Sequence, residues 1–134
     1  MIFIKKSLFI VILCYLFVPF IAFQDSKMED EIVLCFETGN SKTLSGYFNL
    51  NVELAIPGNK NIYSKAQAQQ IMAKFFSENE PEKFQILSNT PKDDSINMIG
   101  LLNTKKALFR VYIVLKKTNG QDHIHLLKIE KRQN

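Results

Sequence analysis

One run of residues, from Ala107 to Leu115, constrains the fold of this chain more than any other segment. It is rich in β-branched and aromatic residues, which are enriched in strands. One set of its alternate positions is entirely apolar: Phe109, Val111, Ile113 and Leu115. The intervening positions are mixed and include Arg110. We therefore predict a central antiparallel strand with one face in a core and the other nearer water.

The turn after this run sets the expected register of the last strand. Asn119-Gly120 is the strongest short hairpin signal, because a type I′ turn needs positive φ at both central residues. A regular continuation of the hairpin places Lys128 opposite Val111 and Glu130 opposite Phe109, both on the apolar face. The alternative is a β-bulge before Lys128, which would turn both charged side chains to the other face.

A second turn, at Lys105-Lys106, pairs the central strand with the segment before it. The expected pairs all lie on the apolar face: Leu102 with Phe109, Gly100 with Val111, Met98 with Ile113, and Ile96 with Leu115. Two hairpins placed independently thus bring apolar side chains to one face. The turn signals and the apolar alternation therefore predict the same sheet. A further strand is expected over 84–88, followed by a loop over 90–94.

Helices and a strand pair are expected before these strands. Capping-box patterns begin helices at Ser26 and Ser64. The other expected elements are a short helix over 41–48 and strands over 50–56 and 61–63. The resulting order is helix–helix–β–β–helix–β–β–β–β. With the helices on one side of the sheet, this order predicts an α+β domain of two layers.

The N-terminal residues have the form of an export signal. Lys5 and Lys6 precede an apolar stretch over 7–18, and Pro19 ends it. We predict that residues 1–23 are a secretory signal and that residues 24–134 form a single domain. An uncleaved anchor is the alternative, because Ala22 is the only small residue near the expected cleavage site. In that case residues 1–23 would be the only contact with the membrane.

The net charge and the small number of histidines argue against nucleic-acid binding and metal binding. Removal of Lys5 and Lys6 lowers the formal net charge from +4 to +2, which is not the basic footprint of a nucleic-acid-binding protein. His123 and His125 share a face at a spacing of two, but a zinc site needs a third or fourth ligand. We therefore predict no metal, no cofactor and no nucleic-acid partner.

The order of the elements resembles the nuclear transport factor 2-like superfamily, which includes SnoaL-like and ketosteroid-isomerase-like proteins. The chain is most similar to an exported bacterial family within it, domain of unknown function 4783. Five segments carry this closer likeness: Phe36-Glu37-Thr38-Gly39-Asn40, Val52-Glu53-Leu54, 62–68, Phe109-Arg110-Val111-Tyr112, and Leu127-Lys128-Ile129-Glu130-Lys131. The resemblance implies a cone of curved antiparallel sheet wrapped around N-terminal helices. It implies an export signal and no activity.

A candidate ligand site follows from the predicted register. Gly100, Lys128 and Glu130 meet at one end of the inner face, where a glycine leaves space and charged groups could hold the polar end of a ligand. The alternative is that both charges extend to water. Tyr47 and Tyr63 are candidates for the same opening, or are core residues with a solvated hydroxyl.

The opposite face of the predicted sheet is a candidate dimer interface. Its expected residues are Leu108, Arg110, Tyr112, Leu127 and Ile129. This face is too apolar to be simply exposed, and arginine and tyrosine are common in interfaces. Relatives of this fold often dimerise by packing sheets face to face, so a homodimer is expected.

The enzymes that this fold resembles use an acidic base with hydrogen-bond donors in the cone. Asp93, Asp94 and Asp122 lie in predicted loops or at a turn, so such a set is not visible. We predict a non-catalytic module of the bacterial periplasm or cell envelope that binds a small apolar ligand or an envelope protein. The alternatives are a small isomerase or hydratase that uses Glu130 or Lys128, and a structural homodimer.

Overall fold

The computed structural model describes residues 24–133, with side chains from Lys27 onward. The predicted signal over 1–23 lies outside the described residues. A compact unit begins at Ile32 and contains the sheet, whereas the described residues before it, 24–31, belong to a separate unit. The prediction of a single domain over 24–134 therefore stays a prediction. Within the described part, no helix is both long enough and apolar enough to span a bilayer.

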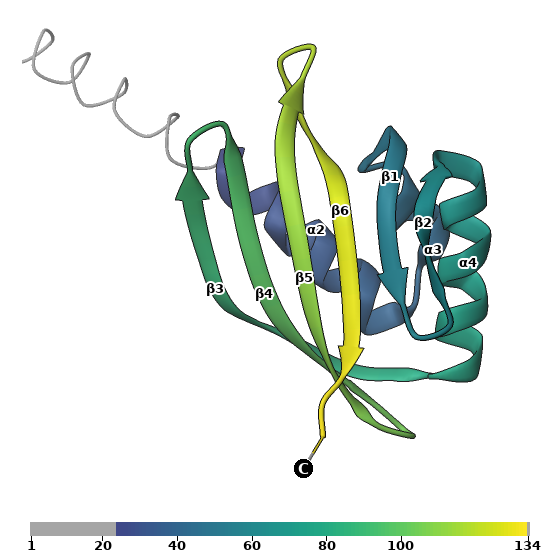
Figure 1. The fold of residues 1–134 in the computed structure, drawn as a ribbon. Coiled ribbons are helices and arrows are strands. Elements are labelled where there is room, and N and C mark those ends of the chain that lie inside the picture. Colours follow the sequence, from purple (N-terminus) through teal and green to yellow (C-terminus); the bar gives the residue numbers. More distant parts are fainter. Residues whose placement is uncertain (1–23, 134) are drawn as a thin grey trace, which may run out of the picture. The chain divides into compact units, whose positions relative to one another are not determined.

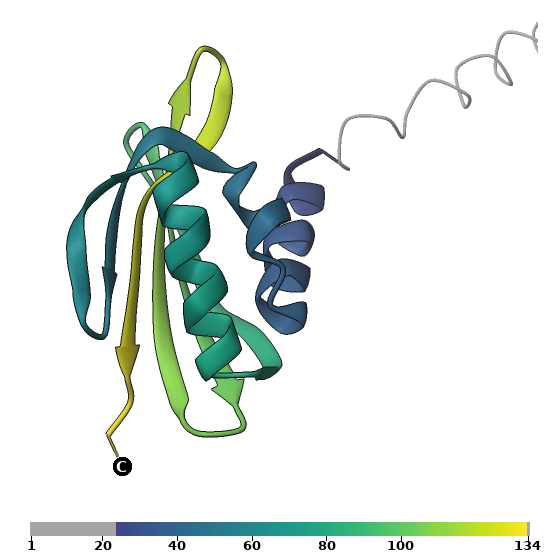
Figure 2. The same ribbon diagram turned by 90° about the vertical axis from the view of Figure 1, so that its right-hand side faces the viewer.

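The elements follow the predicted order and confirm an α+β fold. They are α2 (Gln24–Thr38), α3 (Ser41–Ser45), β1 (Phe48–Ile56), β2 (Asn59–Ser64), α4 (Lys65–Glu78), β3 (Pro81–Lys92), β4 (Ser95–Thr104), β5 (Leu108–Thr118) and β6 (Gln121–Lys131). The strands form one curved, unclosed sheet of six, in the order β2-β1-β6-β5-β4-β3 (Figure 1). β1 and β6 are parallel and the other neighbours are antiparallel. α4 packs against β1, β2 and α3 (Figure 2).

Local signals explain most element boundaries. Gly39 ends α2 with φ of +67°, a conformation that glycine adopts without steric cost. The capping box at Ser64 is confirmed, since its hydroxyl accepts from the Gln67 backbone N–H and the Gln67 side chain accepts from the Ser64 backbone N–H. β3 extends to Lys92, so most of the loop predicted over 90–94 is strand.

The hairpin of β4 and β5 has the predicted register. Leu102 pairs with Phe109, Gly100 with Val111, Met98 with Ile113, and Ile96 with Leu115. The inner residues of β5 are all buried: Phe109, Val111, Ile113 and Leu115. This confirms β5 as the central strand on which the core is built.

The hairpin of β5 and β6 departs from the regular register and corrects the prediction. Leu115 pairs with Ile124 as expected, but Val114 then pairs with Leu126, so His125 is an extra residue in β6. This β-bulge shifts the rest of β6 by one position and reverses its faces. Lys128 and Glu130 are therefore exposed on the outer face, while Leu127 and Ile129 are buried on the inner face.

Gly100 is a position of close packing and not of open space. A methyl group there would come within 2.5 Å of the Phe84 ring and 3.1 Å of the Gln85 carbonyl oxygen. The Phe84 ring in turn stacks on Phe36, with ring centroids 4.7 Å apart. The space that we expected for a ligand is therefore filled by an aromatic side chain.

We predict that Gly100→Ala destabilises the fold by about 1–3 kcal/mol, the range for overpacking a core. The free energy of unfolding from chemical denaturation measures this effect. Because the clash is with the Phe84 ring, Gly100→Ala should cost much less in a Phe84→Leu background. Additive effects in this double-mutant cycle would contradict the proposed contact.

Candidate ligand-binding cavity

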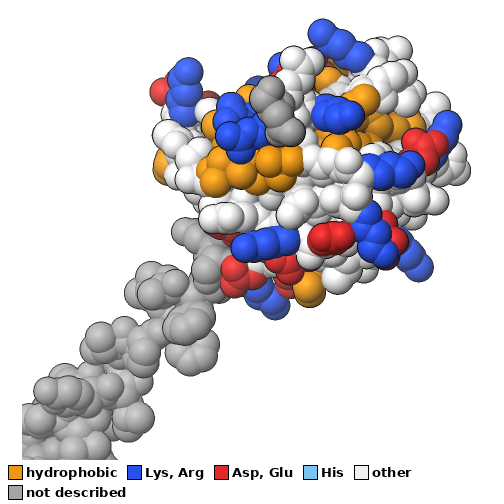
Figure 3. Space-filling view, turned by 90° about the horizontal axis from the view of Figure 1, so that it is seen from below, with side chains coloured by type: hydrophobic (Ala, Val, Ile, Leu, Met, Phe, Trp, Pro, Cys, Tyr) orange, Lys and Arg blue, Asp and Glu red, His pale blue; other side chains and the backbone are white. Residues whose placement is uncertain are grey.

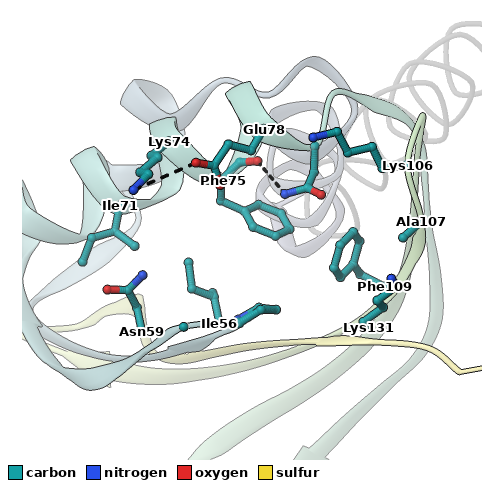
Figure 4. Close-up of a pocket in the computed structure, with 13 residues that line it drawn as sticks. Ile56, Asn59, Ile71, Lys74, Phe75, Glu78, Lys106, Ala107, Phe109 and Lys131 are labelled. Atoms are coloured by element: carbon teal, nitrogen blue, oxygen red, sulfur yellow. Dashed lines mark hydrogen bonds and ion pairs between the residues drawn. The ribbon is translucent and has the colours of Figure 1, made fainter.

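A cavity of about 530 Å³ lies at the end of the sheet where five segments meet (Figure 4). These segments are the β1–β2 turn, the C-terminal half of α4, the β4–β5 turn, the start of β5 and the end of β6. The residues that line it are Ile56, Pro57, Gly58, Asn59, Ile71, Lys74, Phe75, Glu78, Asn79, Lys106, Ala107, Phe109 and Lys131. This volume is within the usual range of small-molecule sites.

The floor of the cavity is apolar. Phe75 from α4 and Phe109 from β5 meet edge to face with ring centroids 5.2 Å apart, and both are buried. Ile71 lies one helical turn before Phe75 and is half-buried. Ile56 at the end of β1 completes this surface. Figure 4 shows these side chains facing the same space from the helix and from the sheet.

The rim of the cavity is polar and mainly basic. On the helix, Lys74 and Glu78 form an ion pair at 3.9 Å, and both side chains are mostly exposed. Lys106 and Lys131 lie on the other side of the opening (Figure 4). Viewed from this end, the molecule presents hydrophobic surface between lysine and arginine side chains (Figure 3). A small ligand would therefore meet apolar groups below and ammonium groups at the mouth.

The β4–β5 turn is held in place by the buried Thr104. Its hydroxyl donates to the Ala107 carbonyl oxygen at 2.8 Å and accepts from the Ala107 N–H at 3.0 Å. The Lys106 N–H lies 3.3 Å from the same hydroxyl. These bonds fix the backbone that carries Lys106 and Ala107 at the edge of the cavity.

The bulge at His125 determines which residue of β6 reaches the cavity. The regular register would place Glu130 opposite Phe109, but the observed partner of Phe109 is Lys131. The charged residue opposite Phe109 is therefore Lys131, which is positive, and not the negative Glu130 that precedes it. Sequence reasoning missed Lys131 because the predicted ligand site was built on the regular register of β6 and not on the bulged alternative.

None of the five residues predicted to bind a ligand lines this cavity. Gly100 lies beneath Phe84, and Tyr47 and Tyr63 are half-buried elsewhere on the unit. On the outer face, the Lys128 ammonium is 2.9 Å from a Glu130 carboxylate oxygen, and this hydrogen bond raises the pKa of Lys128. The two charges neutralise each other in solvent. A ligand role for these five residues stays a prediction.

The predicted dimer residues do not all lie on one face. Arg110 is exposed, and Leu108 and Tyr112 are half-buried on the outer face. Leu127 and Ile129 are buried in the core, because the bulge turns them inward. The interface predicted from the sequence therefore loses two of its members, and a dimer role for the others stays a prediction.

The two histidines lie beside the bulge. The Thr118 hydroxyl is 3.0 Å from Nε2 of His125 and 3.4 Å from Oδ1 of Asn49. Burial lowers the pKa of His125 below its ordinary value of 6.5, and the nearby Lys116 and His123 lower it further. Among the described residues, no group of three histidine, cysteine or acidic side chains could hold a metal ion.

We predict that stability falls on acidification because of His125. A lowered pKa in the folded state means that the unfolded chain takes up the proton first as the pH falls. The free energy of unfolding should therefore decrease as the pH falls through about 6.5, and level off below the folded pKa. Urea unfolding of His125→Gln should show a flatter dependence over this window, whereas an unchanged slope would contradict the assignment. Lys116→Gln, which removes one repulsive charge, should weaken the slope partially.

Comparisons with known proteins place this geometry in a family. Residues 29–130 match the model of a family described as Domain of unknown function (DUF4783). A DUF4783 family protein from Bacteroides ovatus is 32% identical, with a TM-score of 0.74 over 78% of this chain and 94% of that chain. One from Bacteroides uniformis is 30% identical, with a TM-score of 0.74 over 78% of this chain and 97% of that chain. No curated protein matches the chain.

A more distant structure bears on the fold alone. An NTF-2 like protein of unknown function from Silicibacter pomeroyi is 14% identical, with a TM-score of 0.58 over 80% of this chain and 92% of that chain. This match confirms the nuclear transport factor 2-like fold that the sequence predicted.

Proposed function

Because this chain belongs to the family described as Domain of unknown function (DUF4783), whose description states no activity, we propose a function from the cavity itself. We propose that the protein is a non-catalytic module that binds a small apolar ligand between α4 and the end of the sheet. The observation that carries this proposal is the edge-to-face pair of Phe75 and Phe109, which forms an apolar floor open to a polar rim. Apolar pockets with a few polar groups at the edge are the usual form of small-molecule sites.

The one carboxylate at the cavity is poorly suited to be a general base, which favours a binding role over catalysis. Glu78 is the only carboxylate among the lining residues, and its side chain is 58% exposed and paired with Lys74. A general base that acts on a buried substrate needs a carboxylate within hydrogen-bond reach and in a desolvated setting. Glu130 and Lys128, the candidates for an isomerase or hydratase, are on the outer face. Their position argues against that alternative.

We place this activity in the bacterial periplasm or cell envelope. Support comes from the sequence, in which Lys5 and Lys6 precede the apolar stretch over 7–18. Two similar structures come from Bacteroides species, which supports a bacterial setting. Cleavage would release the domain, and an uncleaved segment would tether it.

Native mass spectrometry of the full chain expressed in an exporting host tests this proposal. We expect a mass without residues 1–23, together with added mass that leaves on collisional activation. Ala107→Trp should abolish the added mass, because an indole at this half-buried position would fill the cavity. Leu87→Trp is the matched control, since Leu87 is exposed on β3 and does not line the cavity.

The outcomes separate the parts of the proposal. A chain that carries no added mass would contradict the ligand-binding role. Added mass that persists in Ala107→Trp would place the ligand elsewhere. A recovered mass that still includes residues 1–23 would favour the anchored form over the released one.

A second candidate function is a homodimer through the outer face of the sheet. The observation that favours it is the row of half-buried side chains that includes Leu108 and Tyr112. Tyrosine and arginine are enriched in interfaces, and Arg110 lies between these two residues. Lys128, whose ammonium is 5.6 Å from the centre of the Tyr112 ring, borders the same surface.

We expect Arg110→Glu combined with Tyr112→Glu to convert a dimer into monomers, because four like charges would face one another across a two-fold axis. Size-exclusion chromatography with light scattering measures the mass directly. Lys42→Glu combined with Thr43→Glu on the exposed side of α3 changes the charge by the same three units away from this face, and it should leave the mass unchanged. A dimer that survives the double substitution would reject this interface.

A further inference from the structure

The ion pairs at the cavity are distributed unequally between its two sides. On the helix side, Lys74 is paired with Glu78 at 3.9 Å. On the sheet side, neither Lys106 nor Lys131 has a carboxylate within ion-pair distance among the described residues. The neighbouring Lys105 is different, since it pairs with Glu80 at 3.0 Å. The positive charge that remains at the mouth is therefore concentrated at Lys106 and Lys131.

The backbone positions that carry these two lysines are fixed by hydrogen bonds. Lys106 follows Thr104, whose hydroxyl bonds to both backbone groups of Ala107. Lys131 is the last residue of β6 and pairs with Phe109, one of the two rings of the floor. Both lysines are thus carried by backbone that lies next to the residues of the apolar floor.

Resting on the proposed function, we propose that the ligand is a small carboxylate with an apolar body. Its hydrocarbon part would lie on Phe75 and Phe109, and its carboxylate would be held by Lys106 and Lys131. The backbone N–H groups of Lys106 and Ala107 are already bonded to Thr104, so the two lysines are the charged donors that the sheet side offers. A ligand with an ammonium head would instead meet like charges at the mouth.

The partly enclosed mouth strengthens this selectivity. An ion pair between fully solvated groups contributes only about 0–1 kcal/mol. A carboxylate seated over an apolar floor loses part of its water, and charge-assisted hydrogen bonds are stronger where the local dielectric is lower. Two ammonium groups acting together should therefore discriminate a carboxylate from a neutral head of the same shape.

Calorimetric titration with three matched probes tests the inference: octanoate, octanamide and octylammonium. They share the same chain and differ in the charge of the head. We expect octanoate to bind about tenfold more tightly than octanamide, which corresponds to about 1.4 kcal/mol, and octylammonium to bind most weakly. Added salt should weaken octanoate binding and leave octanamide binding unchanged, because salt screens only the charged contact.

Substitutions assign the effect to the two lysines. Lys106→Gln and Lys131→Gln should each weaken octanoate binding about threefold without changing octanamide binding. Lys117→Gln is the matched control, because it removes the same charge from the exposed far end of β5 and should leave both affinities unchanged. A comparable loss in the Lys117 variant would mean that net charge, and not the site, attracts the probe, and would overturn the inference.

The result also distinguishes this inference from the proposed function. Equal binding of octanoate and octanamide, blocked by Ala107→Trp, would overturn the carboxylate assignment and keep the apolar binding site. Tightest binding of octylammonium would likewise overturn it. Failure of all three probes to bind would contradict both the inference and the apolar binding site.

Discussion

The β-bulge at His125 is the constraint on which the lower half of the sheet depends. With it, Leu127 and Ile129 are buried and Lys128 and Glu130 face water. Without it, two charged side chains would enter the core, at an effective penalty of several kcal/mol per ion. Two apolar side chains would also lose about 1.5–3 kcal/mol each of burial free energy. One extra residue is a small perturbation of the ladder by comparison, so the bulged register prevails.

The same bulge connects the core to the candidate site. It brings Lys131 opposite Phe109, where a regular strand would have placed Glu130. The charge beside the apolar floor is therefore positive and not negative. Together with Lys106 on the turn that Thr104 holds, Lys131 gives the opening its basic character. The preferred ligand charge thus follows from strand register as much as from residue type.

The sequence predicted the fold well where local and long-range signals agreed. The β4–β5 register was correct because the turn at Lys105-Lys106 and the apolar alternation gave the same pairing. The β6 register was wrong because the turn at Asn119-Gly120 fixes Ile124 inward, whereas Leu127 and Ile129 require the opposite parity. That conflict was itself a signal of a bulge. The cavity was not predictable, since its walls come from turns and strand ends whose approach depends on the curvature of the sheet.

The residues that line the cavity are of two kinds, buried and exposed. Its floor includes Phe75 and Phe109, which are buried and whose replacement would disturb the core. Its rim includes Lys106, exposed on a turn, and Lys131, exposed where the last strand ends. Substitution at the rim changes the charge without leaving a void inside the protein. Selection can therefore alter which molecules are recognised while the scaffold persists, so descendants of one ancestral fold could diverge in specificity through very few mutations.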